Sequence, residues 1–537
     1  MDLHESWTAQ AHRAVTELLA ESAADAYGSF SPSVYETARL ISLAPTLPAH
    51  KDRIGFVLDR QRPDGTWGGP DDYRFVPTLS AIEALLRVLH RREMPGAGER
   101  IAAATARGLD AMDRAARTGA GPSLPDTVAV ELIVPGLIID INRLLEAPAP
   151  AELAEWHGHR LPIPAGARPE LLGSLREAVR HGRELPGKLL HSLEIIGPPA
   201  RGATFAGPTE HGVGCSPAAT AAWLGTETAV PGGSPCLAYL EAVRGPEGAV
   251  PVAAPLALFE RSWILSTLAS SGLGLPAHGE PADAVDAALT ESGAAGGTGL
   301  PPDADDTATA LYALALLGRP REPDSLWKYR TGRHFHCFPA ERTPSTTANA
   351  HVLQAFGAWL ATHPASPARY ADALTGLVAW LCEQQRPDGS WADKWHASPY
   401  YATACCATAL ADYGGAAARS AVRGAVDWVL LSQHDDGTWG RWGGTYEETA
   451  YAVKILLNTR VPRTGDAIAR AAAHGALSLL HWDQDAEHPP LWHDKDLYTP
   501  LRIVRAEALA ALHLAHTDPA VSALLAEPVT GQEFEPS

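Results

Sequence analysis

The chain has 537 residues, of which 46% are hydrophobic and only 20% are charged. A chain of this length is too long for a single hydrophobic core, so two or more packed units are expected. Its 43 Lys and Arg residues against 62 Asp and Glu residues give a formal net charge of −19, with histidine counted as neutral. This balance excludes a general attraction to nucleic acid or anionic lipid, and any anionic substrate must be held by local cations or by a metal.

The sequence contains neither a membrane-spanning pattern nor paired cysteine motifs. No apolar run approaches the roughly 20 residues that a transmembrane helix needs. Acidic residues interrupt the opening segment MDLHESWTAQAHRAVTELLAES, which we interpret as an amphipathic helix. The six cysteines form no Cys-x-x-Cys pair. We therefore expect a reduced, cytoplasmic chain with no membrane span and no obligate protein partner.

Helical periodicity dominates the chain. In the segment 77–90, Leu79, Ile82, Leu85, Leu86 and Leu89 recur at three- and four-residue steps and fall on one helical face. The same spacing predicts further helices over residues 305–318, 349–360, 401–414, 446–459 and 501–516. Strand patterns bounded by hairpin turns are scarce, so we predict an all-α protein.

A short pattern occurs three times, at residues 61–67, 385–391 and 433–439, and each copy runs from Gln to Trp through an Asp-Gly pair. We expect a helix before each Gln and another after each Trp. The Gly permits a turn with positive φ, the Gln amide can bond exposed helix ends, and the broad Trp ring can clamp neighbouring helices. We interpret these segments, called Gln–Trp turns below, as structural staples without chemistry.

The distribution of the Gln–Trp turns indicates two helical units. One copy lies near residue 65 and two lie beyond residue 380, and the last two start 48 residues apart, about the length of one helical hairpin with its loops. A TPR- or HEAT-like solenoid is the competing architecture, but the irregular spacing and the Trp-Gly turns argue against it.

The sharpest local feature is the acid cluster Asp303-Ala304-Asp305-Asp306, which runs directly into an apolar helix. Acids at a helix start cap free amides and suit the helix dipole, which explains most such clusters. Three carboxylates within four residues cannot all ionise cheaply, however, and in apolar surroundings one of them can stay protonated near neutral pH. Such a group can protonate a weak base such as an alkene.

The acid cluster and the Gln–Trp turns together resemble class II terpene cyclases, specifically the two-domain bacterial diterpene-type enzymes, whose signature is Asp-x-Asp-Asp. Further segments are similar in the same order along most of the chain: 130–135 (VELIVP), 190–194 (LHSLE), 216–221 (SPAATA), 236–240 (CLAYL) and 258–260 (LFE). The resemblance implies an isomerase made of two α-barrel domains, called β and γ, with the active site between them. It also implies that residues 1–25 and 275–537 form the β domain and that residues 26–274 form an inserted γ domain.

The same resemblance assigns roles to the acidic residues. It implies that Asp305 is the general acid that protonates the terminal alkene of a linear prenyl diphosphate, and that Asp303 and Asp306 position it and keep its proton on. Glu131 is then expected to help hold a Mg²⁺ ion against the diphosphate, a task suited to an oxygen ligand. A surface or capping role is the alternative for Glu131, although an acid within VAVELIVPGLII is costly unless it is paired.

Aromatic and basic residues complete the expected site. Aromatic rings stabilise carbocations through their quadrupoles, and the candidates for lining the pocket are Trp223, Trp263, Tyr312, Trp359, Trp395, Tyr400 and Tyr401. The candidate cations for the diphosphate are Lys188, Arg261, Arg330, Arg333, Lys394 and Arg441, with Lys394 as the first choice. Core packing for each aromatic residue and ordinary solvation for each base are the alternatives.

The end of the reaction departs from the plant pattern. In plant cyclases that make ent-copalyl diphosphate, the His of Leu-His-Ser pairs with an Asn in Pro-Asn-Val to orient a water as the terminating base. His191 is present here, but Val252 occupies the expected Asn position. His191 is then either a catalytic residue or a buried, hydrogen-bonded histidine.

The diphosphate is expected to survive into the product. Class I terpene synthases remove it with Asp-Asp-x-x-Asp, whereas the candidate pairs here read DDYRF, DDTAT and DDGTW. The leading prediction is conversion of geranylgeranyl diphosphate to a copalyl-type (labdane) diphosphate, and the alternative is conversion of farnesyl diphosphate to drimenyl diphosphate. The rivals from other classes are a protein prenyltransferase β subunit, which needs a zinc site and a partner chain, and a non-catalytic helical scaffold.

Overall fold

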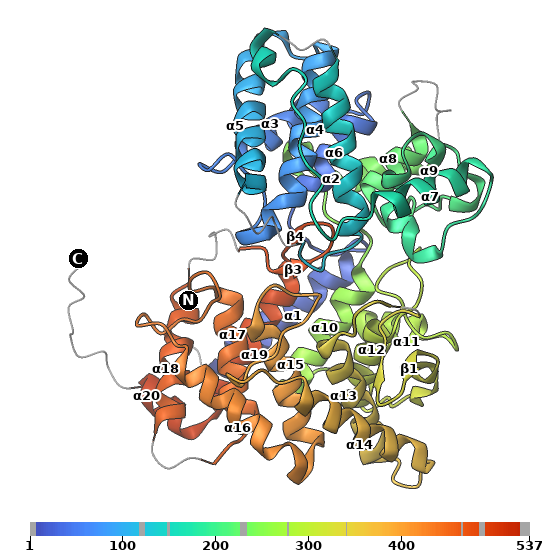
Figure 1. The fold of residues 1–537 in the computed structure, drawn as a ribbon. Helices are drawn as coiled ribbons and strands as arrows, with labels where there is room; N and C mark the ends of the chain where they lie inside the picture. The colour runs from blue at the N-terminus through green and yellow to red at the C-terminus, as the bar shows by residue number, and fades with distance from the viewer. Residues whose placement is uncertain are drawn as a thin grey trace.

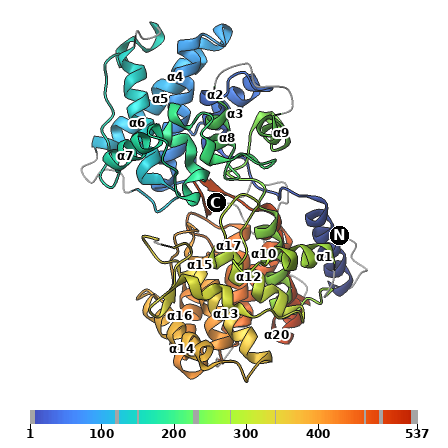
Figure 2. The same ribbon diagram turned by 90° about the vertical axis from the view of Figure 1, so that its right-hand side faces the viewer.

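The computed structural model describes residues 7–117, 124–147, 151–225, 234–276, 279–339, 341–462, 466–482 and 489–526. Helices make up nearly all the regular structure of these ranges, and their strands are four two-residue pieces that form two small antiparallel hairpins. The predicted all-α class is therefore confirmed. Within the described ranges, no helix is both long enough and apolar enough to cross a membrane. Figures 1 and 2 show two helical bodies, one above the other.

A closed ring of inner helices forms the lower body. Helices α10 (Ala257–Ser270), α12 (Ala304–Leu316), α13 (Thr346–Thr362), α15 (Pro399–Tyr413), α17 (Tyr446–Asn458) and α19 (Leu501–Thr517) pack in that order, and α19 returns to α10. The outer helices are α1 (Trp7–Ala24), α11 (Glu280–Ala288), α14 (Ala368–Glu383), α16 (Gly415–Leu431), α18 (Ala467–Leu480) and α20 (Pro519–Ala526). Between α12 and α13 the chain forms the 3₁₀ helix η8 (Pro323–Tyr329) and the hairpin of β1 (Arg330–Thr331) and β2 (His334–Phe335). This double ring is an α-barrel.

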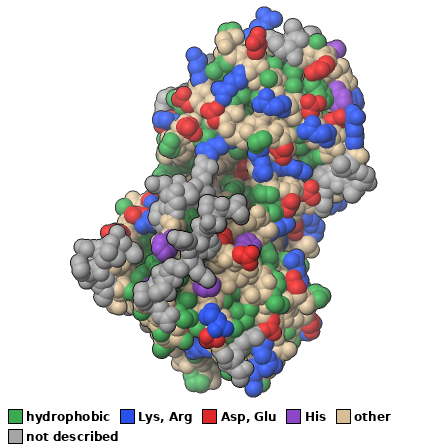
Figure 3. Space-filling view, turned by 90° about the vertical axis from the view of Figure 1, so that its left-hand side faces the viewer, with side chains coloured by type: hydrophobic (Ala, Val, Ile, Leu, Met, Phe, Trp, Pro, Cys, Tyr) green, Lys and Arg blue, Asp and Glu red, His purple; other side chains and the backbone are tan. Residues whose placement is uncertain are grey.

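The upper body is a smaller ring. α2 (Val34–Leu43), α4 (Phe75–Arg91), α6 (Val130–Glu146), the 3₁₀ segment η4 (Gly187–Ile196) and α8 (Pro217–Leu224) pack in that order, and α8 returns to α2. Its other helices are α3 (His50–Asp59), α5 (Gly98–Arg117), α7 (Pro169–Arg180) and α9 (Pro235–Ala242), with short 3₁₀ helices η1 (Asp71–Arg74), η2 (Pro95–Ala97), η3 (Ala151–Trp156), η5 (Pro198–Ala200), η6 (Thr204–Ala206) and η7 (Pro246–Gly248). Figure 3 shows the narrowing between the two bodies, with Lys and Arg side chains spread over the upper one.

Separate hydrophobic cores divide the chain between the bodies. Ala11, Val15 and Leu18 of α1 join the lower core, whereas the main upper core draws on residues 35–249. Residues 1–6 of the predicted first helix lie outside the described ranges. Because α10 packs in the lower ring, the boundary between the bodies falls before it, not at residue 274 as predicted. The Gly- and Pro-rich stretch between α10 and α12 has the composition of a linker, but its helix α11 packs against α10 and α12 of the barrel.

The three Gln–Trp turns share one geometry. Trp67, Trp391 and Trp439 are fully buried, and each indole donates to the carbonyl oxygen ten residues before it, at 2.6, 2.8 and 2.8 Å. Each Gln amide donates to two carbonyl oxygens, one within its own turn and one on an adjacent helix. The turn glycines Gly65, Gly389 and Gly437 all have positive φ. The predicted stapling of helices is confirmed.

A hairpin of the lower body reaches the junction with the upper body. β3 (Trp492–His493) and β4 (Leu497–Tyr498) are joined by Asp494-Lys495-Asp496, and they lie between the two bodies in Figure 1. The ammonium of Lys495 is fully buried, 2.6 Å from Glu36 and 3.0 Å from Glu194 of the upper body. Burial alone would lower the pKa of Lys495, but the two carboxylates outweigh it and raise the pKa. The lysine therefore stays charged and ties the two bodies together.

Candidate active site

The acid cluster forms the N-terminal turn of α12. Asp303 is the N-cap, and its Oδ1 accepts hydrogen bonds from the backbone N–H groups of Asp305 and Asp306, both at 2.8 Å. This cap fixes the direction in which Asp305 leaves the helix. Burial raises the pKa of Asp303 to about 6. Burial, together with the charge of Asp303, raises the pKa of Asp306 well above its usual range, so Asp306 keeps its proton near neutral pH.

Asp305, the middle acid, is paired with a histidine that the sequence analysis missed. The Nδ1 atom of His351, on α13, lies 2.6 Å from Asp305 Oδ1. Burial would lower the pKa of His351, but the Asp305 carboxylate outweighs it and raises the pKa to about 10, so the ring is an imidazolium. The Asp305 side chain is 14% exposed, and the hydrogen bonds that it makes to other described side chains end on Oδ1. The sequence signal for His351 was a polar residue inside the apolar helical segment 349–360.

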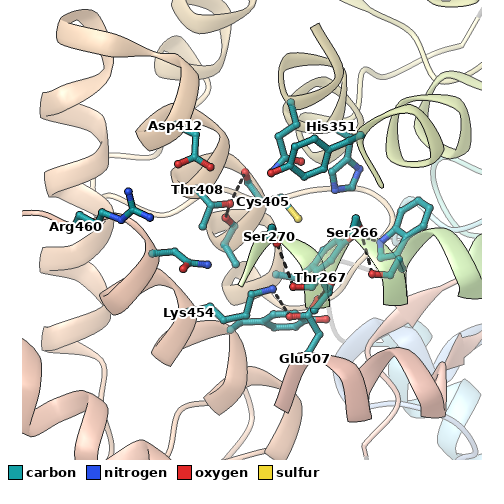
Figure 4. Close-up of a pocket in the computed structure, with 17 residues that line it drawn as sticks. Ser266, Thr267, Ser270, His351, Cys405, Thr408, Asp412, Lys454, Arg460 and Glu507 are labelled. Carbon is teal, nitrogen blue, oxygen red and sulfur yellow. Dashed lines mark hydrogen bonds and ion pairs between the residues drawn. The ribbon is translucent and has the colours of Figure 1, made fainter. Parts of the chain in front are cut away.

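The inner helices enclose a polar lumen of about 80 Å³ that reaches His351. His351 and Cys405 line it together with the ion pair of Lys454 and Glu507, and Figure 4 shows these side chains directed into the same space. Asp412, at the C-terminal end of α15, also lines the lumen. The lumen therefore runs from His351, the partner of Asp305, toward the C-terminal ends of the inner helices.

A larger cavity, the interdomain pocket, lies between the two bodies and has a volume of about 310 Å³. Its lower wall is made of residues that lie just before inner helices, and these include Leu256, Pro301, Thr343, Trp395 and Asp494. Its upper wall comes from α6, η4 and the segment before α6, and it includes Asp126, Glu131, Leu132, Lys188, Leu189 and His191. The N-terminal ends of the inner helices, including the acid cluster of α12, therefore face the upper body.

The interdomain pocket brings together the predicted metal ligand and two of the predicted cations. Glu131 and Lys188 line it from the upper body, and Lys394 lines it from the lower one. Lys394 forms an ion pair with Glu341 and lies 5.0 Å from the centre of the Trp395 ring. Glu341 is a further charged lining residue that the sequence analysis missed.

The carboxylate of Glu131 is only loosely paired. It is partly exposed, and Arg342 Nη1 lies 3.9 Å from its Oε1. Arg342 itself bonds Asp126 at 2.6 Å and also lines the pocket. Among the described residues, no cation lies closer to Glu131 than this arginine, so Glu131 offers the pocket an oxygen ligand.

His191 lines the same pocket and pairs with a carboxylate from the opposite body. Its Nε2 lies 3.0 Å from Asp494 Oδ1, and its Nδ1 lies 2.7 Å from the carbonyl oxygen of Gly214. A carbonyl oxygen and a carboxylate only accept hydrogen bonds, so both ring nitrogens carry a hydrogen. Burial opposes a charge on His191, but Asp494 outweighs it and raises the pKa of the ring. In this form His191 has no lone pair with which to take a proton.

Comparison with known proteins decides the family. The chain is 44% identical over 501 residues to an ent-copalyl diphosphate synthase from Streptomyces sp. (strain KO-3988), which covers 93% of this chain and 95% of that protein. It is 43% identical over 517 residues to a labda-7,13-dienyl diphosphate synthase from Streptomyces clavuligerus, over 94% of this chain and 93% of that protein. The chain belongs to the copalyl diphosphate synthase family of bacterial class II diterpene cyclases.

Solved structures agree with this membership in the family. The ent-copalyl diphosphate synthase from Streptomyces platensis is 46% identical, with a TM-score of 0.88 over 94% of this chain and 99% of that one. Abietadiene synthase from Abies grandis, at 19% identity and a TM-score of 0.57, shares the fold over 95% of this chain and 59% of that one. The family model described as the squalene-hopene cyclase C-terminal domain matches residues 342–477. As a class II diterpene cyclase the chain is an isomerase with the βγ architecture, and the prenyltransferase and scaffold rivals are excluded.

The predicted pocket aromatics of the cyclase fall in different places. Trp395 lines the interdomain pocket, whereas Trp263, Tyr312 and Tyr401 line the lumen. Three others pack elsewhere: Tyr400 lies against Trp428, Trp359 stacks on His363, and Trp223 donates to the carbonyl oxygen of Ala203. The prediction of Trp223, Trp359 and Tyr400 as pocket residues is therefore not supported by their positions.

Two of the predicted aromatics, Trp263 and Tyr401, belong to a compact cluster with Phe259 and Trp492, which were not predicted. The Phe259 ring lies 4.5 Å from Trp263 and 5.6 Å from Trp492, and Trp492 lies 4.7 Å from Tyr401. Trp492 belongs to the β3–β4 hairpin, so nothing in its local sequence pointed to α10.

The remaining predicted cations of the cyclase do not line the interdomain pocket. Arg333 is exposed and forms a two-pronged pair with Glu383 at 2.8 and 2.9 Å, which corrects its assignment to the diphosphate. Arg330 is exposed on β1, Arg441 bonds the carbonyl oxygen of Ala397, and Arg261 bonds the carbonyl oxygens of Ser22 and Ala23. These residues lie close in sequence to matched segments, but their side chains bond groups outside the interdomain pocket.

Proposed function

We propose that this enzyme protonates and bicyclises geranylgeranyl diphosphate and releases a copalyl-type (labdane) diphosphate with the diphosphate retained. The observation that carries the proposal is the pairing of Asp305 with the His351 imidazolium, in a helix turn capped by Asp303 and shared with a protonated Asp306. Relatives named for copalyl, labda-7,13-dienyl and terpentedienyl diphosphates support a C20 substrate.

Asp305 starts the reaction in this proposal. In the resting pair Asp305 is the carboxylate partner of the His351 imidazolium, so the proton that adds to the alkene is first taken up on its other oxygen, Oδ2. The positive ring stabilises the carboxylate that remains after transfer. The proton adds to the terminal alkene, and the resulting cation is attacked by the next double bonds in turn to close the two rings.

Asp305 must regain a proton after each turnover, and the polar lumen offers the route. His351 and Cys405 lie at its inner end, with the hydroxyl group of Thr408 and the carboxyl group of Asp412 farther along α15 (Figure 4). Water in such a channel can pass protons between these groups and the solvent.

The polar groups of the interdomain pocket are assigned to the diphosphate. Lys394, Lys188 and Arg342 are cations that line it. Glu131 would hold a Mg²⁺ ion, because Mg²⁺ in such sites uses one or two carboxylates and takes its other ligands from substrate phosphates and water. Within the described ranges, no group of three or more His, Cys, Asp or Glu residues could hold a metal by itself, which fits this arrangement. When bound, the ion would neutralise part of the diphosphate charge.

The test is to incubate the purified protein and Mg²⁺ with geranylgeranyl or farnesyl diphosphate, remove the diphosphate with phosphatase, and analyse the alcohols by mass spectrometry. We expect a bicyclic C20 alcohol from geranylgeranyl diphosphate, made by an enzyme that we place in the cytoplasm. A bicyclic C15 alcohol from farnesyl diphosphate alone would favour the drimenyl alternative. The absence of a bicyclic alcohol from both substrates would contradict the proposal.

A further inference from the structure

The proposed reaction must end with the loss of a proton from the bicyclic cation, which requires a base that faces the interdomain pocket. The carboxylates that line this pocket are Asp126, Glu131, Glu341 and Asp494. The first three lie next to the cations assigned to the diphosphate. Asp126 bonds Arg342, Glu131 lies 3.9 Å from the same arginine, and Glu341 bonds Lys394.

Asp494 differs from these carboxylates in its surroundings. It lies on the hairpin turn between β3 and β4, and its Oδ1 accepts hydrogen bonds from His191 Nε2 at 3.0 Å and from the backbone N–H of Lys495 at 2.6 Å. In the described part of the chain, the hydrogen bonds to its side chain end on Oδ1, and the side chain is 14% exposed. Its Oδ2 is therefore left to face the pocket.

The charges of the pair favour the carboxylate as the base. His191 carries a hydrogen on both ring nitrogens, because its two partners are acceptors only. Burial would raise the pKa of Asp494, but His191 outweighs it and lowers the pKa, so the carboxylate is ionised at neutral pH. Val252, at the position where plant cyclases have an Asn, is buried and has no polar side-chain atom.

We propose that Asp494 is the terminating base and that His191 is the residue that positions it, one from each body of the enzyme. This inference rests on the proposed function and identifies a further catalytic residue within it. A C–H bond next to the final cationic carbon breaks, and its electron pair forms the new C=C bond. The proton goes to Asp494 Oδ2, and water that enters the open pocket then removes it from the carboxylic acid.

The experiment compares wild type with Asp494→Asn on geranylgeranyl diphosphate and Mg²⁺, measuring kcat and the products after phosphatase treatment. Asn keeps the shape and the acceptor for His191 but cannot take the proton. We expect kcat to fall at least about 100-fold, and the remaining product to shift from the alkene toward a hydroxylated bicycle formed when water captures the cation. A D494N enzyme with wild-type products and kcat within about 2-fold would overturn the assignment.

Asp496→Asn is the matched control. Asp496 lies on the same turn, bonds Ser33 and the backbone of Tyr35, and does not line the interdomain pocket. D496N is expected to keep the wild-type product, so a product change in D496N as large as that in D494N would overturn the assignment by showing that the hairpin as a whole sets the outcome.

His191→Gln separates the two members of the pair and remains informative if D494N does not fold. We expect H191Q to keep the alkene product at a reduced kcat, because the carboxylate of Asp494 remains. A shift to the hydroxylated product in H191Q would identify His191 as the base and overturn the proposal. A wild-type enzyme that does not cyclise geranylgeranyl diphosphate would overturn the proposed function itself. If wild type is active and the products of D494N are unchanged, only the assignment of Asp494 as the base is overturned.

Discussion

At the scale of single residues, the proposed acid Asp305 is paired with a cation at the start of α12. His351 lies 2.6 Å from Asp305, and this pair lies beside Asp306, which keeps its own proton. The imidazolium stabilises the Asp305 carboxylate left after proton transfer.

The first prediction concerns His351→Gln and the pH dependence of stability. The pKa of His351 is raised from 6.5 to about 10, so its contribution to folding is fully present below pH 6.5 and is lost as pH rises through about 10. We expect H351Q to lower the free energy of unfolding by on the order of 3 kcal/mol at pH 6 and by much less near pH 10. Urea unfolding across this range measures the difference, and a difference that does not change with pH would contradict the ion pair.

The second prediction concerns the diphosphate cations. Lys394→Met is expected to raise KM for geranylgeranyl diphosphate at least about 10-fold, since a charge-assisted contact to the substrate is worth ~1.4 kcal/mol or more. Arg333→Ala is the matched control, because Arg333 pairs with Glu383 on the surface and should leave KM unchanged. Equal KM values for K394M and wild type would show that Lys394 does not bind the diphosphate.

Much of the catalytic turn could be predicted from local sequence, because Asp303, Asp305 and Asp306 are neighbours in one helix turn. The residues that pair with the site residues could not be predicted in this way. His351 is 46 residues from Asp305, and Asp494 is 303 residues from His191, so these pairs depend on how the helices close into rings. Arg333 was misassigned for the converse reason, since closeness in sequence to a matched segment does not place a side chain in the pocket.

At the scale of elements, the Gln–Trp turns hold successive helix pairs together. Gln385 bonds the carbonyl oxygens of Gly389 and Ala421, both at 2.8 Å, and thereby ties its turn to α16. Gln61 makes the corresponding bonds in the upper body. The same device therefore serves both barrels, and its local chemistry was visible in the sequence.

The third prediction is that Gln385→Ala lowers the free energy of unfolding by about 1–3 kcal/mol, since two buried carbonyl oxygens lose their donor. The kcat of the folded enzyme should stay within about 2-fold of wild type. Gln61→Ala is the parallel variant in the upper body, and urea unfolding with activity assays measures both. A large loss of kcat without loss of stability would contradict a purely structural role.

At the scale of the whole molecule, the interdomain pocket depends on the contact between the two bodies. Lys495 is buried against Glu36 and Glu194, and Asp494 beside it pairs with His191, so one hairpin makes both contacts. Two helical units were predictable from periodicity and the distribution of the turns, and their barrel form from the resemblance to class II terpene cyclases. Their boundary was not, because the loop after α10 has the composition of a linker.

The fourth prediction concerns this junction. Lys495→Met leaves two buried carboxylates without their cation and is expected to lower the free energy of unfolding by ~3 kcal/mol or more. High salt should change this loss little, because buried pairs are weakly screened. Arg333→Ala, which removes an exposed pair, should lower the free energy of unfolding far less than K495M does. A K495M enzyme as stable as wild type would show that the cluster does not hold the bodies together.

The central claim is that Asp305 supplies the proton that starts cyclisation. Its most direct test is the turnover of geranylgeranyl diphosphate by Asp305→Asn, alongside circular dichroism and protection from thermal unfolding by the substrate with Mg²⁺. We predict that D305N keeps the fold and the protection by substrate but loses bicyclic product by at least about 100-fold. A folded D305N enzyme that forms the bicyclic diphosphate at close to the wild-type rate would contradict the account.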